Sequence, residues 1–262
     1  MTKKIEEMIK TNDGFEIYTL YEVPPKSTGT VLICHGITAD LHENGLFDNF
    51  SELFFDHSIS VLRFDFRGHG KSKGNSLDVT LEGEYSDITS VYAWIKKSSD
   101  YNGTYAILGA SFSCASVIRQ SIKFTPKCLV LFNPVFSYKR TFVVPEASWG
   151  KEILETKNKS DLPPSAVAKI PGTEFFISKI LWEEMENDQT PKLAKNLKCP
   201  TRAFHGDEDI KVPIQPIKDF VDTESNIIEL EVKKGEGHGL KGNRPELIKQ
   251  ITNWISSYLL EA

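Results

Sequence analysis

A serine within a run of small residues is the first candidate for chemistry. Ser111 stands in Gly109-Ala110-Ser111-Phe112-Ser113, after an apolar run that predicts a strand and before a helical pattern. A nucleophilic serine needs a sharp strand-to-helix turn, with small residues two positions before and after it, because strand and helix nearly collide there. The usual pattern is Gly-x-Ser-x-Gly, and Ser113 replaces its second glycine. We predict that Ser111 is a catalytic nucleophile, on a motif that departs from the pattern at one position.

A histidine between glycines is the candidate general base. His238 lies in Gly237-His238-Gly239, after the last predicted strand and before the last predicted helix. Such loops often present catalytic side chains, although a solvated turn residue is the alternative. One known chain order for a catalytic triad is serine, then acid, then histidine. That order favours His238 among the six histidines.

Three acidic residues compete for the third position of the triad. Asp207, Glu208 and Asp209 all follow the predicted strand 201–205, between the serine and the histidine. A carboxylate there could hold the imidazole in its working tautomer. The alternative is a solvated acidic turn, with one member capping the helix that begins near Pro213.

Two backbone amides are expected to stabilise the negative charge that develops on the substrate oxygen. One is the N–H of Phe112, next to the nucleophile, and the other is the N–H of Ile37, after the predicted strand 30–35. His35, at the end of that strand, is interpreted as structural.

Short apolar runs alternate with helical patterns along most of the chain, which is typical of βα units on a mostly parallel sheet. Several runs are continuously apolar, as expected for strands that helices cover on both faces. The predicted strands are 15–23, 30–35, 60–64, 105–110, 127–132, 201–205 and 227–232, and the predicted helices include 81–97, 112–123 and 244–260.

The alternation stops between about residues 136 and 187, where prolines and aromatic residues accumulate. We interpret this stretch as an insertion and not a second fold. The expected organisation is a core of residues 1–135 and 188–262 with a cap at 136–187. Aromatic residues of the cap could form an apolar wall around an acyl group or simply pack the cap onto the sheet.

Composition limits the partners. The chain has 262 residues, a net charge of −5 and no long basic cluster, which argues against nucleic acid as a partner. No apolar run approaches the length of a membrane helix, and the charged opening does not resemble a signal peptide, so a cytoplasmic protein is expected. No metal or cofactor is expected, and the four cysteines, without CxxC spacing, are expected to be buried thiols. The sequence does not indicate an oligomeric state.

Five short runs together resemble the α/β-hydrolase superfamily over almost the whole chain. They are 31–36 (VLICHG), 63–72 (RFDFRGHGKS), the serine turn, 205–213 (HGDEDIKVP) and 237–239 (GHG). The resemblance implies an eight-stranded, mostly parallel sheet with helices on both faces and a small cap inserted after strand 127–132. It also implies that Asp209 is the acid and that the loop 65–72, with His69, is structural.

Within that superfamily the chain looks most like small bacterial carboxylesterases of the cinnamoyl or feruloyl esterase kind. The Ser-x-Ser turn is similar to that of the acyl-carrier-protein thioesterases that supply fatty acid for bacterial bioluminescence. The expected function is hydrolysis, through an acyl-enzyme, of a small-molecule ester with an apolar or aromatic acyl group. One alternative is a thioesterase or acyltransferase acting on acyl-ACP or acyl-CoA with the same triad. A non-catalytic binding scaffold is a second alternative, and a peptidase is disfavoured because the cap has no acidic cluster to hold an amine.

Overall fold

An eight-stranded sheet runs through the molecule in the order β1-β2-β4-β3-β5-β6-β9-β10. The computed structural model describes residues 2–260. Six strands are parallel, from β4 to β10, whereas β2 is antiparallel to β4 and to β1. The strands are β1 (Lys3–Lys10), β2 (Glu16–Val23), β3 (Thr30–Cys34), β4 (Ser60–Phe64), β5 (Tyr105–Ala110), β6 (Leu129–Phe132), β9 (Thr201–Gly206) and β10 (Glu229–Lys233). The expected α/β fold with an eight-stranded, mostly parallel sheet is confirmed.

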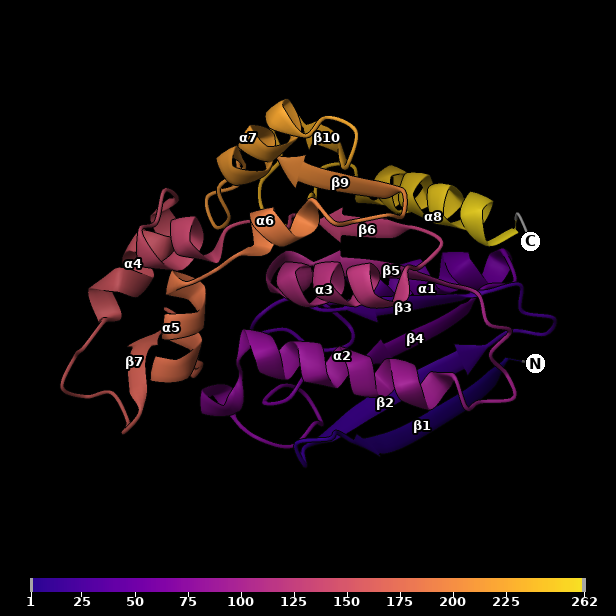
Figure 1. The fold of residues 1–262 in the computed structure, drawn as a ribbon, viewed down its shortest axis with the longest axis horizontal. Helices are drawn as coiled ribbons and strands as arrows, with labels where there is room; N and C mark the ends of the chain where they lie inside the picture. The colour runs from indigo at the N-terminus through magenta and orange to yellow at the C-terminus, as the bar shows by residue number, and fades with distance from the viewer. Residues whose placement is uncertain (1, 261–262) are drawn as a thin grey trace.

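Helices cover both faces of this sheet (Figure 1). On one face lie α2 (Leu81–Ile95), α3 (Cys114–Phe124) and α7 (Gln215–Thr223), and on the other α1 (Leu46–Asp56) and α8 (Arg244–Leu260). Side chains of β3 alternate between the two layers: Leu32 packs on the α2 and α3 side, and Val31 and Ile33 pack on the α1 and α8 side. Burial on both faces explains why the central strands are continuously apolar.

Strand β1 was not predicted from the sequence. It is an edge strand paired only with β2, and Ile9 is its one fully buried residue. A strand with so little buried surface lacks the apolar pattern by which strands are recognised.

Between β6 and β9 the chain leaves the sheet and forms a separate group of elements at one end of the strands (Figure 1). They are a π-helical turn (Lys139–Val143), α4 (Ser148–Thr156), a hairpin of β7 (Ala166–Lys169) and β8 (Phe176–Ser178), and α5 (Lys179–Glu186). The chain then returns to the sheet through α6 (Thr190–Ala194), which packs against α3 (Figure 1). The cap boundaries of 136–187 stay a prediction. Within residues 2–260, no helix has the length and apolar character needed to cross a bilayer. All four cysteines are buried free thiols, as expected.

Candidate active site

Ser111 occupies a strained turn at the carboxyl end of β5. Its φ angle is +51°, in the left-handed region that non-glycine residues rarely adopt. The turn brings α3 close to the strand, since a Cβ atom on Gly109 would lie 2.7 Å from a methyl group of Val117. Gly109 is therefore required by packing. The local chain has the strand, turn and helix that project a serine from the sheet edge.

The serine that replaces the second glycine of the motif is part of the scaffold. Ser113 is fully buried, and its hydroxyl contacts the carbonyl oxygens of Cys34 at 3.2 Å and Ala110 at 3.0 Å. These contacts tie the start of α3 to the end of β3. The Ser113 side chain is thus used within the protein, and it does not line the cavity beside Ser111.

An acid and a histidine meet at the same end of the sheet. The Nδ1 atom of His238 lies 2.7 Å from Oδ2 of Asp209, although the two residues follow different strands, β10 and β9. The Asp209 side chain is fully buried, and its Oδ1 accepts hydrogen bonds from the amides of Lys211 at 2.8 Å and Val212 at 3.0 Å. With Nδ1 donating to the carboxylate, the His238 Nε2 atom is free to accept a proton.

The acids that competed with Asp209 are directed elsewhere. The Asp207 carboxylate accepts a hydrogen bond of 2.6 Å from the amide of Gly235, and Glu208 is exposed and has no contact with His238 among the hydrogen bonds of residues 2–260. Burial by itself raises the pKa of Asp209. Hydrogen bonds from His205 and His238 lower the pKa by more than burial raises it, so the pKa of Asp209 is well below its usual range. Asp209 is therefore an anion at neutral pH.

Ser111 and His238 line one cavity of about 410 Å³. Three buried apolar residues, Leu46, Ala110 and Phe132, are among those that line it. Within residues 2–260 the Ser111 hydroxyl has no hydrogen-bond partner, so the link between serine and histidine is open here. Such links commonly tighten only when substrate is bound.

The two predicted oxyanion amides are not used by the rest of the structure. On either side of Ile37, the Gly36 amide donates to Oε2 of Glu43 at 2.8 Å and the Thr38 amide donates to Nε2 of His69 at 3.3 Å. Across residues 2–260, neither the Ile37 nor the Phe112 amide has an acceptor in the protein. Both amides are thus available to an added oxygen atom.

Two buried histidines hold the peptide that carries Ile37. His35 donates from Nδ1 to the carbonyl oxygen of Gly36 at 2.8 Å, and His69 accepts from Thr38. The two rings contact each other edge to face, with centroids 4.9 Å apart. Burial lowers the pKa of His35 to about 4, and burial together with the neighbouring His35 lowers the pKa of His69 to about 3. Both rings are neutral at pH 7, as is required for His35 Nε2 to accept from the Phe66 amide and for His69 Nε2 to accept from the Thr38 amide.

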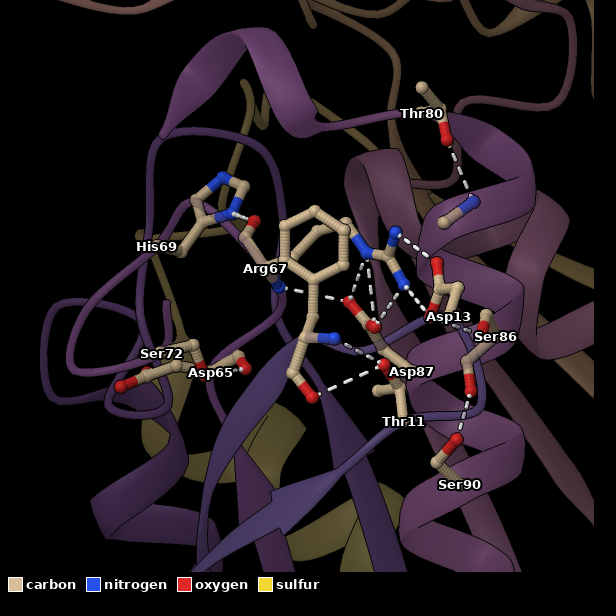
Figure 2. A network of polar contacts seen from close by, with 12 residues as sticks. Thr11, Asp13, Asp65, Arg67, His69, Ser72, Thr80, Ser86, Asp87 and Ser90 are labelled. Atoms are coloured by element: carbon tan, nitrogen blue, oxygen red, sulfur yellow. Dashed lines mark hydrogen bonds and ion pairs between the residues drawn. The ribbon is translucent and has the colours of Figure 1, made fainter. Parts of the chain in front are cut away.

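The loop 65–72 that carries His69 is anchored by a buried arginine (Figure 2). The Arg67 guanidinium lies between Asp87 of α2 at 2.7 Å and Asp13 of the β1–β2 turn at 2.6 Å. Within the loop, the Ser72 hydroxyl donates to the carbonyl oxygen of Asp65 at 2.6 Å. These contacts agree with the interpretation of the loop as structural.

A tyrosine of the inserted segment reaches the serine turn. The fully buried Tyr138 hydroxyl donates to the carbonyl oxygen of Phe112 and accepts from the amide of Ala115 at 3.1 Å. It therefore fixes the peptides that follow Ser111. Tyr138 was not predicted as a site residue, because its only signal in the sequence is an aromatic residue shortly after a strand end.

The expected aromatic wall does not form around Ser111. No residue of 136–187 lines the cavity that contains Ser111. The aromatic side chains of this segment are instead packed with one another and with Phe112, as in the contact of Phe142 with Trp149 at 5.5 Å between centroids. Phe175 and Phe176 line a separate cavity of about 700 Å³ that reaches Thr38 of the oxyanion loop. Aromatic residues suit a core as well as a pocket, so composition alone could not separate the two.

Several polar residues that line the cavity were not predicted from the sequence: Glu43, Asn133, Lys211, Lys241 and Arg244. Three of them lie within six positions of Asp209 or His238 in the sequence, which is the one signal that could have identified them. In the part of the chain that the structure describes, no group of three His, Cys, Asp or Glu side chains is arranged to hold a metal ion.

Comparison with known proteins gives the class. The family model described as serine aminopeptidase S33 (Hydrolase_4) matches residues 25–172, more than half of the chain. The chain therefore belongs to this family of hydrolases and has the α/β-hydrolase fold.

Individual relatives are distant. YqkD of Bacillus subtilis is 28% identical over 116 residues, covering 44% of this chain and 37% of that protein. Protein phosphatase methylesterase 1 of Candida albicans is 24% identical over 201 residues, covering 69% of this chain and 52% of its own length. The chain thus spans about a third to a half of the length of these curated relatives.

The fold is shared with a solved esterase. Est1E from Butyrivibrio proteoclasticus, in its complex with ferulic acid, superposes with a TM-score of 0.74 at 21% identity, covering 97% of this chain and 98% of that one. At this identity the likeness supports the fold, and it agrees with the family assignment.

Proposed function

We propose that this protein is a serine carboxylesterase in which Ser111, His238 and Asp209 form the catalytic triad. The observation that carries the proposal is the hydrogen bond between His238 and the buried Asp209, at a cavity that also contains Ser111. A buried carboxylate orients the imidazole and stabilises it once protonated. A serine in a left-handed turn beside that imidazole suits nucleophilic attack.

The reaction has two halves. Ser111 Oγ attacks the carbonyl carbon of the ester while His238 Nε2 takes the hydroxyl proton, and the oxyanion accepts hydrogen bonds from the amides of Ile37 and Phe112. The bond to the leaving alcohol then breaks, the proton passes from His238 to that alcohol, and an acyl-enzyme remains. Water, deprotonated by His238, attacks the acyl-enzyme in the same way, releasing the acid and restoring Ser111.

The acyl group is proposed to be apolar. Leu46 and Ala110, apolar residues of the cavity lining that belong to the segment after β3 and to β5, would contact an aliphatic or small aromatic group. The complex of Est1E with ferulic acid adds aromatic acids to the compounds worth testing. An aminopeptidase reaction, which the family description suggests, fits less well, because a substrate with a free amine would meet three cationic side chains in this cavity.

A fluorophosphonate probe and a substrate panel test this proposal. The probe should label Ser111 covalently, and Ser111→Ala should abolish both the labelling and the hydrolysis of para-nitrophenyl esters of graded chain length. The same acyl groups should be offered as CoA thioesters. Far faster turnover of the thioesters would replace the esterase by a thioesterase, and a folded, unlabelled protein would support a binding scaffold.

A further inference from the structure

The cavity beside Ser111 carries more positive than negative side chains. Lys211, Lys241 and Arg244 line it, against a single carboxylate, that of Glu43. Among residues 2–260, none of the three cations has a carboxylate within 4.0 Å. Glu43 is already engaged, since its carboxylate accepts the hydrogen bond from the Gly36 amide. Three positive charges against one negative charge make the cavity lining positive in total.

A buried amide adds an unused donor. Asn133 lines the cavity and is 1% exposed, and its Oδ1 accepts a hydrogen bond of 3.3 Å from the amide of Gly206. Its Nδ2 atom is buried without a partner in the described chain. The Nε atom of Arg244 is buried without a partner as well, while its terminal nitrogen donates to the Gly239 carbonyl at 2.9 Å. Buried donors of this kind are costly unless a ligand or water pairs with them.

The sheet order indicates which part of the substrate these groups would meet. Ser111 follows β5, and the oxyanion amide of Ile37 follows β3, the neighbour of β5 on one side. Asn133 follows β6, Lys211 follows β9, and Lys241 and Arg244 follow β10, all on the opposite side of β5. His238 also follows β10. In the proposed mechanism His238 protonates the leaving group, so the leaving group lies on the cationic side.

From this arrangement we propose that the preferred substrate is an ester whose alcohol part carries an anionic group, a carboxylate or a phosphate. The anion would pair with Lys211, Lys241 and Arg244 and accept a hydrogen bond from Asn133. The inference rests on the proposed esterase function and specifies its substrate class.

Matched esters test it. Two aryl butyrates are compared, one with para-hydroxybenzoate and one with para-hydroxybenzamide as the leaving group. They differ in the charge of the leaving group but hardly in its shape. We expect kcat/KM to favour the carboxylate by about tenfold at low ionic strength, with the preference shrinking as salt screens the charges. The butyrate of para-hydroxyphenyl phosphate compares phosphate with carboxylate. Phenyl hydrogen succinate carries a charge on its acyl side, and phenyl butyrate carries none. We expect no such preference between these two esters.

Substitutions of cavity residues test whether the preference for a charged leaving group depends on this cavity. Lys241→Gln and Lys211→Gln should each reduce the ratio between charged and neutral esters by about threefold. Lys249→Gln removes an exposed charge from α8 outside the cavity and should leave the ratio unchanged. A ratio near one in the unmodified protein, or one that Lys249→Gln lowers as much as Lys241→Gln does, would overturn the inference.

Different results would overturn the proposed substrate class and the esterase proposal. Normal labelling of Ser111 and turnover of neutral esters, without preference for an anionic leaving group, would overturn only the substrate class. An equal preference for a charge on the acyl side would also overturn it. Absence of both labelling and ester turnover would overturn the esterase proposal together with this inference.

Discussion

The imidazole of His238 and the carboxylate of Asp209 are joined over 2.7 Å, although 28 residues separate them in the chain and each follows a different strand. Asp209 also holds the amides of Lys211 and Val212 through its other oxygen. The carboxylate is thus held by hydrogen bonds within its own loop, in addition to its contact with the histidine. This arrangement distinguishes Asp209 from its acidic neighbours.

Replacing this carboxylate by an amide should disable the proposed base. In Asp209→Asn the side-chain oxygen can still accept from Lys211 and Val212, and its NH₂ group then faces His238 Nδ1. That donor favours the tautomer with the proton on Nε2, which cannot accept the serine proton. We expect kcat to fall by about three to four orders of magnitude in an ester assay.

Asp207→Asn is the matched control, because an asparagine oxygen can still accept the hydrogen bond from Gly235. Its kcat should stay within about twofold of the unmodified protein. Equal losses in the two variants would mean that the acidic turn as a whole, and not its contact with His238, supports activity.

Tyr138→Phe should impair the proposed oxyanion amide without touching the triad. The change removes the hydroxyl that holds the Phe112 carbonyl and the Ala115 amide. We expect a loss of about 1–2 kcal/mol in stability and a fall of about tenfold in kcat with little change in KM. Steady-state kinetics and urea unfolding measure the two effects.

Tyr105→Phe separates stability from positioning. The Tyr105 hydroxyl donates to the carbonyl of Phe124 at 2.9 Å, at the other end of the same helix, α3. It should cost similar stability but leave kcat nearly unchanged. A similar fall in kcat for both variants would assign the Tyr138 effect to general loosening of α3.

The chemistry-bearing loops were largely predictable from the sequence, because turn and catalytic motifs are local. Ser111 and its turn were predicted from five consecutive residues, and the sheet was predicted from continuously apolar strands. Strand β1 was not predicted because this edge strand buries too few side chains to leave an apolar pattern. The contribution of Tyr138 to the serine turn is a contact over 26 residues, which depends on how the inserted segment folds back.

The lining of the cavity could not be derived in the same way. Lysines such as Lys211 and Lys241 are ordinary surface residues in sequence, and only the position of their loops brings them to one opening. The aromatic residues of 136–187 suggested an apolar wall around an acyl group, which they do not form at Ser111. Most of their side chains are buried against one another and against residues of the sheet domain such as Phe112.

The histidine pair at the oxyanion loop predicts a dependence of stability on pH. An unfolded histidine binds a proton near pH 6.5, whereas the pKa is about 4 for folded His35 and about 3 for folded His69. Both folded values are lowered, so the unfolded chain binds more protons as the pH falls below 6.5. The stabilisation is complete above pH 6.5 and is lost as the pH falls toward 4 and then 3. Each unit of difference corresponds to about 1.4 kcal/mol.

Proton NMR of the histidine ring protons would measure this directly. Two signals should remain in their neutral positions down to about pH 5, that of His35 should shift near pH 4 and that of His69 near pH 3, and urea unfolding should show decreasing stability between pH 6.5 and 4. In His69→Gln one of the two signals disappears, and the slope of stability against pH should fall by about one proton. Titration of all six histidines near pH 6.5 would contradict the proposed clamp on Ile37.

Arg67 should matter far more than an ion pair of similar geometry at the surface. Its guanidinium is almost fully buried between Asp13 and Asp87, and Asp87 is itself fully buried. Arg67→Met would leave Asp87 as an uncompensated buried charge, so we expect about 3–5 kcal/mol of destabilisation in urea unfolding. Arg202→Met is the control: it breaks a contact of 2.7 Å with the exposed Glu229 and should cost below about 1 kcal/mol.

A second substitution identifies the cause of the Arg67 effect. Arg67→Met combined with Asp87→Leu removes the unpaired charge, and it should recover part of the lost stability. Because Arg67 also orders the loop that presents His69 to Thr38, kcat should remain low in the double variant even where stability returns. Full recovery of kcat along with stability would show that the loop holds the oxyanion peptide without help from Arg67, and that its ion pairs serve the fold alone.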